Sequence, residues 1–180
     1  MRATILKYGL VAGAVAGGSL LAFGLNWDGK PPPAWGMAAG FASMLVALTA
    51  VFVGIKHHRD HALGGMIRFW PALGLGLAIS AVATACYVLA WEVVVAVVDS
   101  DMAAFFADSM VERARAAGAT GAELARAMRD AREFEALYRN PLARMGITAV
   151  EFLPVGVLVS LVSAAVLRNP RVLPIHSTHA

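Results

Sequence analysis

The sequence has little charge and almost no cysteine. Charged residues make up 15% of the 180-residue chain and apolar residues 59%, whereas a soluble domain averages roughly 25% charged and 45–50% apolar residues. The single cysteine, Cys86, excludes an intrachain disulfide and says nothing of the redox compartment. This composition indicates a lipid environment rather than a soluble domain.

Patterns that mark common catalytic and ligand-binding sites are also missing. There is no GxSxG nucleophile motif, no HExxH or paired-cysteine metal motif, and no glycine-rich phosphate loop after a strand. No basic patch is interleaved with aromatic residues, so we expect no nucleic-acid partner. The sequence therefore predicts no enzyme activity and no cofactor.

The apolar residues are gathered in four long blocks. A helix of about 20 residues crosses a hydrocarbon core of about 30 Å. We predict membrane spans over residues 5–25, 35–55, 69–98 and 142–167. A cleaved signal peptide is the alternative for the first block, but its apolar run exceeds the usual length of about 7–15 residues, so we favour a retained span.

The orientation of these spans follows from the basic residues in the short flanking segments. The N-terminal segment, the polar loop 56–68 and the tail after residue 167 together carry seven lysines and arginines. The opposite short loop, 26–33, contains three consecutive prolines and only one basic residue, Lys30. We predict that both termini face the cytoplasm.

Residues 99–140 are too polar to span a membrane but have the signals of two helices. Candidate N-caps follow the third span at Asp99, Ser100 and Asp101. Apolar residues then recur at helical spacing up to Gly118, which predicts a helix stop. Thr120 and Glu123 match a capping box that begins a second helix. We predict antiparallel helices over 101–117 and 121–139.

The predicted fold class is all-α. It is an integral membrane four-helix bundle with an extracytoplasmic helical hairpin between helices three and four, forming a single membrane domain over residues 1–180. Small residues lie at four-residue intervals in every span, in the first at Gly9, Gly13 and Gly17. Such glycines let helices approach closely. They would join two copies through the first span or pack it inside one bundle, and we favour the second reading.

Four residues form a candidate intramembrane polar site. Glu92 and Glu151 fall within the third and fourth spans, where a charge costs about 2.5–3.5 kcal/mol at the bilayer centre and normally finds a partner. Arg144 would reach either carboxylate, and Pro154 frees a backbone carbonyl. These residues would form either a proton or ion site or a structural ion pair. We favour the structural pair.

The loop after the second span holds three histidines. His57, His58 and His61 lie beside Asp60, and His57 and His61 would share one face of a helix. A metal site is one reading. Interfacial histidines without a ligand are the reading that we favour.

Taken together, the chain resembles a bacterial membrane-protein family catalogued as domain of unknown function 4199. The resemblance rests on Leu6-Lys7-Tyr8-Gly9, Val53-Gly54-Ile55-Lys56, Arg59-Asp60, Leu63-Gly64-Gly65, Leu137-Tyr138-Arg139-Asn140-Pro141 and Glu151-Phe152-Leu153-Pro154-Val155-Gly156. It implies a multi-pass protein of the bacterial inner membrane and assigns no activity.

Two functions follow as hypotheses. The first is a non-enzymatic membrane module whose outward hairpin packs over the bundle or contacts a protein partner or a second copy. The second is a small transporter or channel subunit that uses Glu92 and Glu151. Apart from that partner, the chain is expected to contact the lipid bilayer.

Overall fold

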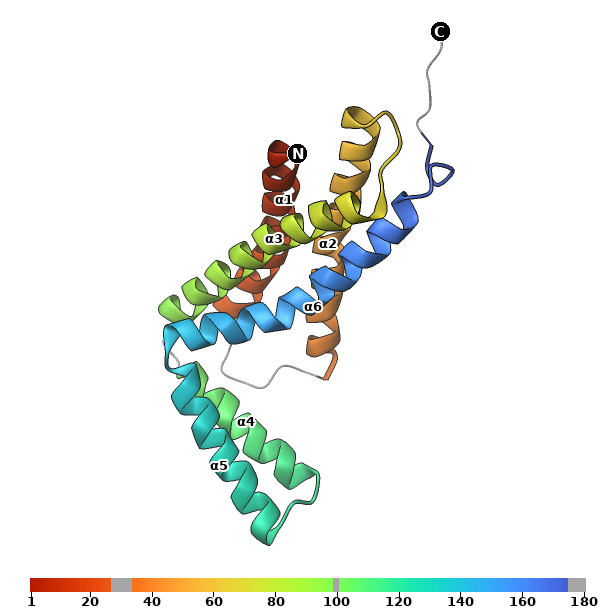
Figure 1. Cartoon of the computed structure of the whole chain (residues 1–180). Coiled ribbons are helices and arrows are strands. Elements are labelled where there is room, and N and C mark those ends of the chain that lie inside the picture. Colours follow the sequence, from red (N-terminus) through yellow and green to blue (C-terminus); the bar gives the residue numbers. More distant parts are fainter. Residues whose placement is uncertain (27–33, 99–100, 175–180) are drawn as a thin grey trace.

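The computed structural model describes residues 1–26, 34–98 and 101–174, and the described residues are helical with no strand. The helices are α1 (Arg2–Leu25), α2 (Ala34–Ala62), α3 (Phe69–Val97), α4 (Met102–Ala116), α5 (Gly121–Tyr138) and α6 (Pro141–Leu167) (Figure 1). The predicted all-α class is confirmed for these residues. The predicted proline-rich loop and the N-cap candidates Asp99 and Ser100 lie outside them.

Four of the helices, α1, α2, α3 and α6, are long and apolar enough to cross a membrane. Helix α2 continues to Ala62, past the predicted end of the second span at residue 55 and into the segment 56–68 that was predicted as a loop. Lys56 and Asp60 form an ion pair of 2.5 Å one turn apart in this extension. Polar residues oppose burial in lipid, but they do not oppose helix formation.

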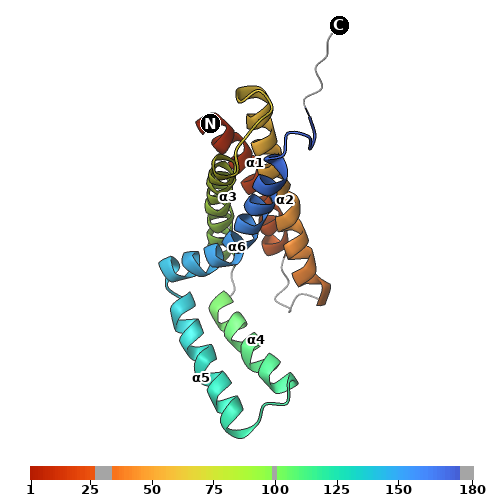
Figure 2. The ribbon, with the colours of Figure 1, turned by 45° about the vertical axis from the view of Figure 1, so that its right-hand side comes forward.

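The four long helices share one apolar core. Ala12 of α1, Leu48 of α2, Ile79 of α3 and Phe152 of α6 are fully buried in it. Helix α3 packs against both α1 and α6. Figure 2 shows α3 and α2 on opposite sides of the core, with α1 and α6 each packed against both of them. The core therefore fixes the position of α3 and α6, the two helices that carry the candidate polar residues.

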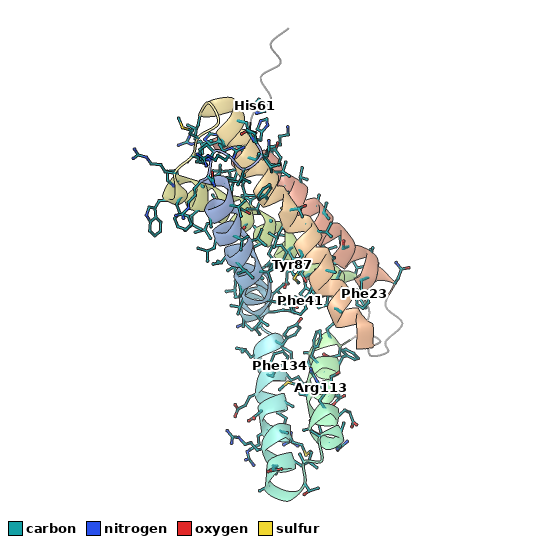
Figure 3. The ribbon with its side chains drawn as sticks, turned by 90° about the vertical axis from the view of Figure 1, so that its right-hand side faces the viewer. Phe23, Phe41, His61, Tyr87, Arg113 and Phe134 are labelled. Atoms are coloured by element: carbon teal, nitrogen blue, oxygen red, sulfur yellow. The ribbon has the colours of Figure 1, made fainter. Side chains whose placement is uncertain are left out.

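Helices α4 and α5 form the hairpin, which extends from one end of the core. The start of α1, the connection between α2 and α3 and the end of α6 lie at the opposite end (Figure 1). In Figure 3, His61 marks that opposite end, and Phe134 lies in the half of the hairpin nearest the core. The predicted helices 101–117 and 121–139 agree with α4 and α5 to within one residue at each end.

The two predicted signals at the hairpin tip had different outcomes. The stop at Gly118 is confirmed: its φ is +87°, its amide donates to the Arg115 carbonyl, and the Ala119 amide donates to the Ala114 carbonyl. The capping box is wrong, because the Thr120 side chain makes no cap hydrogen bond. Gly121 begins the helix at a left-handed φ of +54°, and the Thr120 backbone carbonyl accepts the Glu123 amide instead.

Candidate functional site

Near the base of the hairpin, an ion pair between Glu92 of α3 and Arg144 of α6 joins these two helices. Asn140 caps α6 by accepting the Leu142 and Ala143 amides, which begins the helix so that Arg144 lies at the end of its first turn. The guanidinium donates from Nε to Glu92 Oε1 at 2.9 Å and from Nη2 to Oε2 at 2.5 Å. With side chains only 13% and 17% exposed, this two-point pairing is stronger than an ordinary surface ion pair.

Aromatic residues pack around this ion pair. Trp91, next to Glu92 on α3, donates its indole N–H to the Tyr138 hydroxyl at 2.7 Å. Phe106 of α4 and Phe134 of α5 each lie with ring centroids 5.4 Å from that of Tyr138. The Arg144 guanidinium lies 5.9 Å from the Tyr138 ring centroid. Burial raises the pKa of Tyr138 to about 12, so its hydroxyl stays protonated at neutral pH.

We call Trp91, Glu92, Tyr138 and Arg144 the junction. It links α3, α5 and α6 through hydrogen bonds and a charged pair. Sequence reasoning identified Glu92 and Arg144 but missed Trp91 and Tyr138. Both aromatics are adjacent in sequence to polar residues near helix ends, which is where amphipathic rings with a hydrogen-bonding group are commonly found.

A second, exposed contact closes the base of the hairpin. Asp101 caps α4 by accepting the Ala104 amide at 3.1 Å, and its other oxygen accepts from Arg139 at 2.5 Å. The Ala104 amide and the Arg139 guanidinium together lower the pKa of Asp101. Arg139 also donates to Glu135 at 2.9 Å. This contact joins the start of α4 to the end of α5.

Glu151 lies apart from the junction. It is exposed on the outside of α6, and no hydrogen bond or ion pair to it is formed among the described residues. The next residue, Phe152, is fully buried with its ring 4.8 Å from that of Tyr87. The sequence left both Glu92 and Glu151 open as partners of Arg144, and in the structure Arg144 binds Glu92. Seven residues of helix separate Arg144 from Glu151, about 10 Å of axial rise, which is too far for contact.

Pro154 lies inside α6 on its exposed side. Proline has no amide to donate to the carbonyl one turn earlier, and it clashes sterically with that turn. Figure 2 shows α6 bending near its middle. This bend lets the first half of α6 reach the hairpin while the second half packs in the core.

Gly9, Gly13 and Gly17 of α1 face α3. A methyl group added at Gly9 would lie 2.6 Å from Val82 Cβ, and one at Gly17 would lie 3.1 Å from Ala90 Cβ. A methyl group at Gly13 would overlap Cys86. This face of α1 is therefore occupied by α3 of the same chain and is not open to a second copy.

Polar residues inside the core bond to one another. The Ser160 hydroxyl donates to the Gly156 carbonyl at 2.7 Å, and the Ser80 hydroxyl has both that carbonyl, at 3.3 Å, and Ser160 Oγ, at 3.2 Å, as acceptors. Among the described residues, no buried side-chain nitrogen or oxygen lacks a hydrogen-bond partner. These groups hold α3 against α6.

At the other end of the molecule, Arg59 is fully buried. It donates to the Val172 and Leu173 carbonyls at 3.0 and 2.6 Å and to Asp60 at 2.7 Å. Arg59 therefore fastens the segment after α6 to α2. Sequence reasoning assigned it no role beyond its charge, although the Arg59-Asp60 pair was part of the family resemblance.

The histidines lie on α2 near Arg59. The rings of His57 and His61 are 4.2 Å apart, and His61 Nδ1 lies 3.0 Å from the His57 carbonyl oxygen. In the described ranges, no three side chains of the metal-binding types, whether from these histidines or elsewhere, come together as a metal site requires.

These features define an all-helical protein with four candidate membrane spans and a braced helical hairpin. Residues 7–169 match the family described as "Protein of unknown function (DUF4199)", so the chain belongs to that family. The resemblance found in the sequence is thereby confirmed. No curated protein and no solved structure matches the chain.

Proposed function

We propose that this chain is a non-enzymatic membrane module that presents its hairpin, in a fixed orientation, to a protein partner outside the cytoplasm. The observation that carries this proposal is the junction. A hairpin of two helices has little core of its own, so its direction relative to the membrane depends on its attachment. Here Trp91 of α3 donates a hydrogen bond to buried Tyr138 of α5, the rings of Phe106 and Phe134 pack against Tyr138, and the Arg144 guanidinium that binds Glu92 lies 5.9 Å from the Tyr138 ring centroid.

The orientation is part of the proposal. The segments that carry the seven basic residues of the short flanks lie at the end of the molecule opposite the hairpin (Figure 1). Basic residues in short flanking segments favour the cytoplasmic side. Both termini would then lie in the cytoplasm of a bacterial cell, with the core in the inner membrane and the hairpin outside.

Photo-cross-linking in native membranes tests this function. A photoreactive residue is placed at Met128, a partly exposed residue of the hairpin, and in a control at Val46, an exposed apolar residue of α2. We expect a protein adduct at Met128 and lipid adducts at Val46. Arg144→Gln should weaken the Met128 adduct because α6 loses its ion pair to α3 beside Tyr138, where the hairpin contacts the core, whereas Arg171→Gln, at an exposed site, should not. The absence of a protein adduct from the hairpin would refute the proposal.

A second candidate function, a transporter or channel subunit, is supported by Glu151 alone. Glu151 has no partner among the residues that the structure describes, and such a carboxylate on a candidate span would bind a proton or an ion, whereas Glu92 is already bound to Arg144. Ion or proton flux into vesicles containing the purified chain, abolished by Glu151→Gln, would support this candidate. Equal flux in the wild type and the variant would end it.

A further inference from the structure

The hairpin carries an open groove between its two helices. The groove has a volume of about 420 Å³. Its floor is apolar, with Ala107 and Val111 from α4 and Met128 and Ala131 from α5. The two alanines are buried where the helices touch, and Val111 and Met128 remain partly exposed. Two small residues at the seam leave room that a neighbouring apolar side chain would fill.

The charges along the groove differ in whether they are already paired. Glu112 binds Arg115 at 2.6 Å, and Glu135 binds Arg139 at 2.9 Å. Asp108 on the α4 wall and Arg132 on the α5 wall are exposed, and neither forms a hydrogen bond or ion pair within the described residues. Counting partners only in the described part of the chain, the groove therefore has one free negative charge on one wall and one free positive charge on the other.

These two free charges lie at the same height along the hairpin. Asp101 and Arg139 are joined at the base and fix the register of the antiparallel helices. Asp108 comes seven residues after Asp101, and Arg132 comes seven residues before Arg139. At 1.5 Å per residue, both lie about 10 Å from the base.

We infer that this groove binds the same groove of a second copy of the chain. Two copies inserted in one membrane with the same orientation can be related by a two-fold axis only along the membrane normal. Turning a hairpin about that axis brings its α4 opposite α5 of the other copy and leaves every residue at its own height. Asp108 of each copy then faces Arg132 of the other, and Val111 faces Met128.

The contact would convert two helical hairpins into a four-helix bundle with two ion pairs at its edge. The two ion pairs need no charge from a further molecule, because each copy supplies both an aspartate, Asp108, and an arginine, Arg132. The inference rests on the proposed function, since it requires the hairpin to stand outside the membrane, and it names a second copy as the partner.

Paired charge reversals test this contact. Full-length copies tagged with a donor or an acceptor fluorophore are reconstituted in lipid vesicles, and energy transfer is followed on dilution with lipid. The variants are Asp108→Arg and Arg132→Asp. The matched controls are Asp130→Arg and Arg126→Asp, which change the charge equally at exposed α5 positions outside the groove.

Each groove variant alone should associate about tenfold more weakly than the wild type, because two attractive pairs become two like-charge contacts. An equimolar mixture of the two groove variants should regain wild-type association, since each Asp108→Arg copy then meets two aspartates. The controls should associate as the wild type does. Failure of the mixture to recover, an equal loss in the controls, or no energy transfer in the wild type would each overturn the inference.

The two proposals fail in distinguishable ways. A Met128 adduct with a different protein, together with no charge-dependent self-association, would uphold the display function and overturn the second copy as partner. Absence of any hairpin adduct would overturn both. If Asp108 and Arg132 of the same copy paired with each other, the mixture of the two groove variants would not regain wild-type association, and this result would also contradict the inference.

Discussion

Replacing Arg144 by leucine removes one member of the junction ion pair and leaves Glu92 charged among Trp91 and Tyr138. The side chains of the pair are 13% and 17% exposed, so water replaces the lost partner only in part. Breaking a fully buried pair costs about 3–5 kcal/mol, and a partly exposed one should cost less. We expect Arg144→Leu to lower the free energy of unfolding by about 2–3 kcal/mol.

The comparison that isolates this effect is the double variant. Replacing both Glu92 and Arg144 by leucine removes the uncompensated charge, so the double variant should be within about 1 kcal/mol of the wild type. Thermal melting in detergent, followed by tryptophan fluorescence, measures the four proteins of the cycle. Arg139→Leu is the control, because its exposed pairs should contribute little. Strictly additive effects of Glu92→Leu and Arg144→Leu would refute the reasoning.

Three further predictions concern single positions. Gly9→Val should lower the free energy of unfolding by about 1–3 kcal/mol through overpacking against α3. Gly18→Val should be tolerated, because a methyl group added at Gly18 meets nothing within 4 Å. Thermal melting in detergent compares the two variants. Gly121→Ala should destabilise the hairpin by about 1–2 kcal/mol because the φ of Gly121 is +54°, whereas Thr120→Ala should have almost no effect because the Thr120 hydroxyl makes no cap hydrogen bond. Hydrogen exchange of the α5 amides measures both variants. Equal destabilisation by the two would contradict the cap geometry. The pKa of Asp101 is lowered from 3.8 by the Ala104 amide and by Arg139, so the Asp101 carboxylate stabilises the hairpin above pH 3.8 and this stabilisation is lost as the pH falls through the lowered pKa. Protection of the α4 amides from hydrogen exchange should fall over that pH range. Asp101→Asn should remove the pH dependence of this protection.

The sequence predicted well those features that depend on local physical rules. A span requires about 20 consecutive apolar residues, so all four long helices were found. The hairpin was found because Asp101 and Gly118 are local start and stop residues and apolar residues repeat between them. Helix α2 extends beyond the predicted span because residues 56–62 are too polar for lipid and yet favour a helix.

The features that the sequence did not predict depend on tertiary contacts. Spacing along α6 placed Arg144 on one face with Glu151, but only the packing of α6 on α3 decides that Glu92 is within reach. In the same way, burial of Arg59 depends on where the chain turns after α6. Thr120 and Glu123 had the residue types of a capping box, and the left-handed conformation of Gly121 removed the geometry that the box requires.

The side of the membrane on which the hairpin lies is tested most directly by cysteine accessibility. In a Cys86→Ala background, Thr120→Cys places a thiol at the hairpin tip, and Asn169→Cys places one after the end of α6. A maleimide that does not cross the inner membrane is added to intact spheroplasts. We predict labelling of Thr120→Cys in intact spheroplasts and labelling of Asn169→Cys only after the membrane is disrupted. Labelling of Thr120→Cys only after disruption would contradict it.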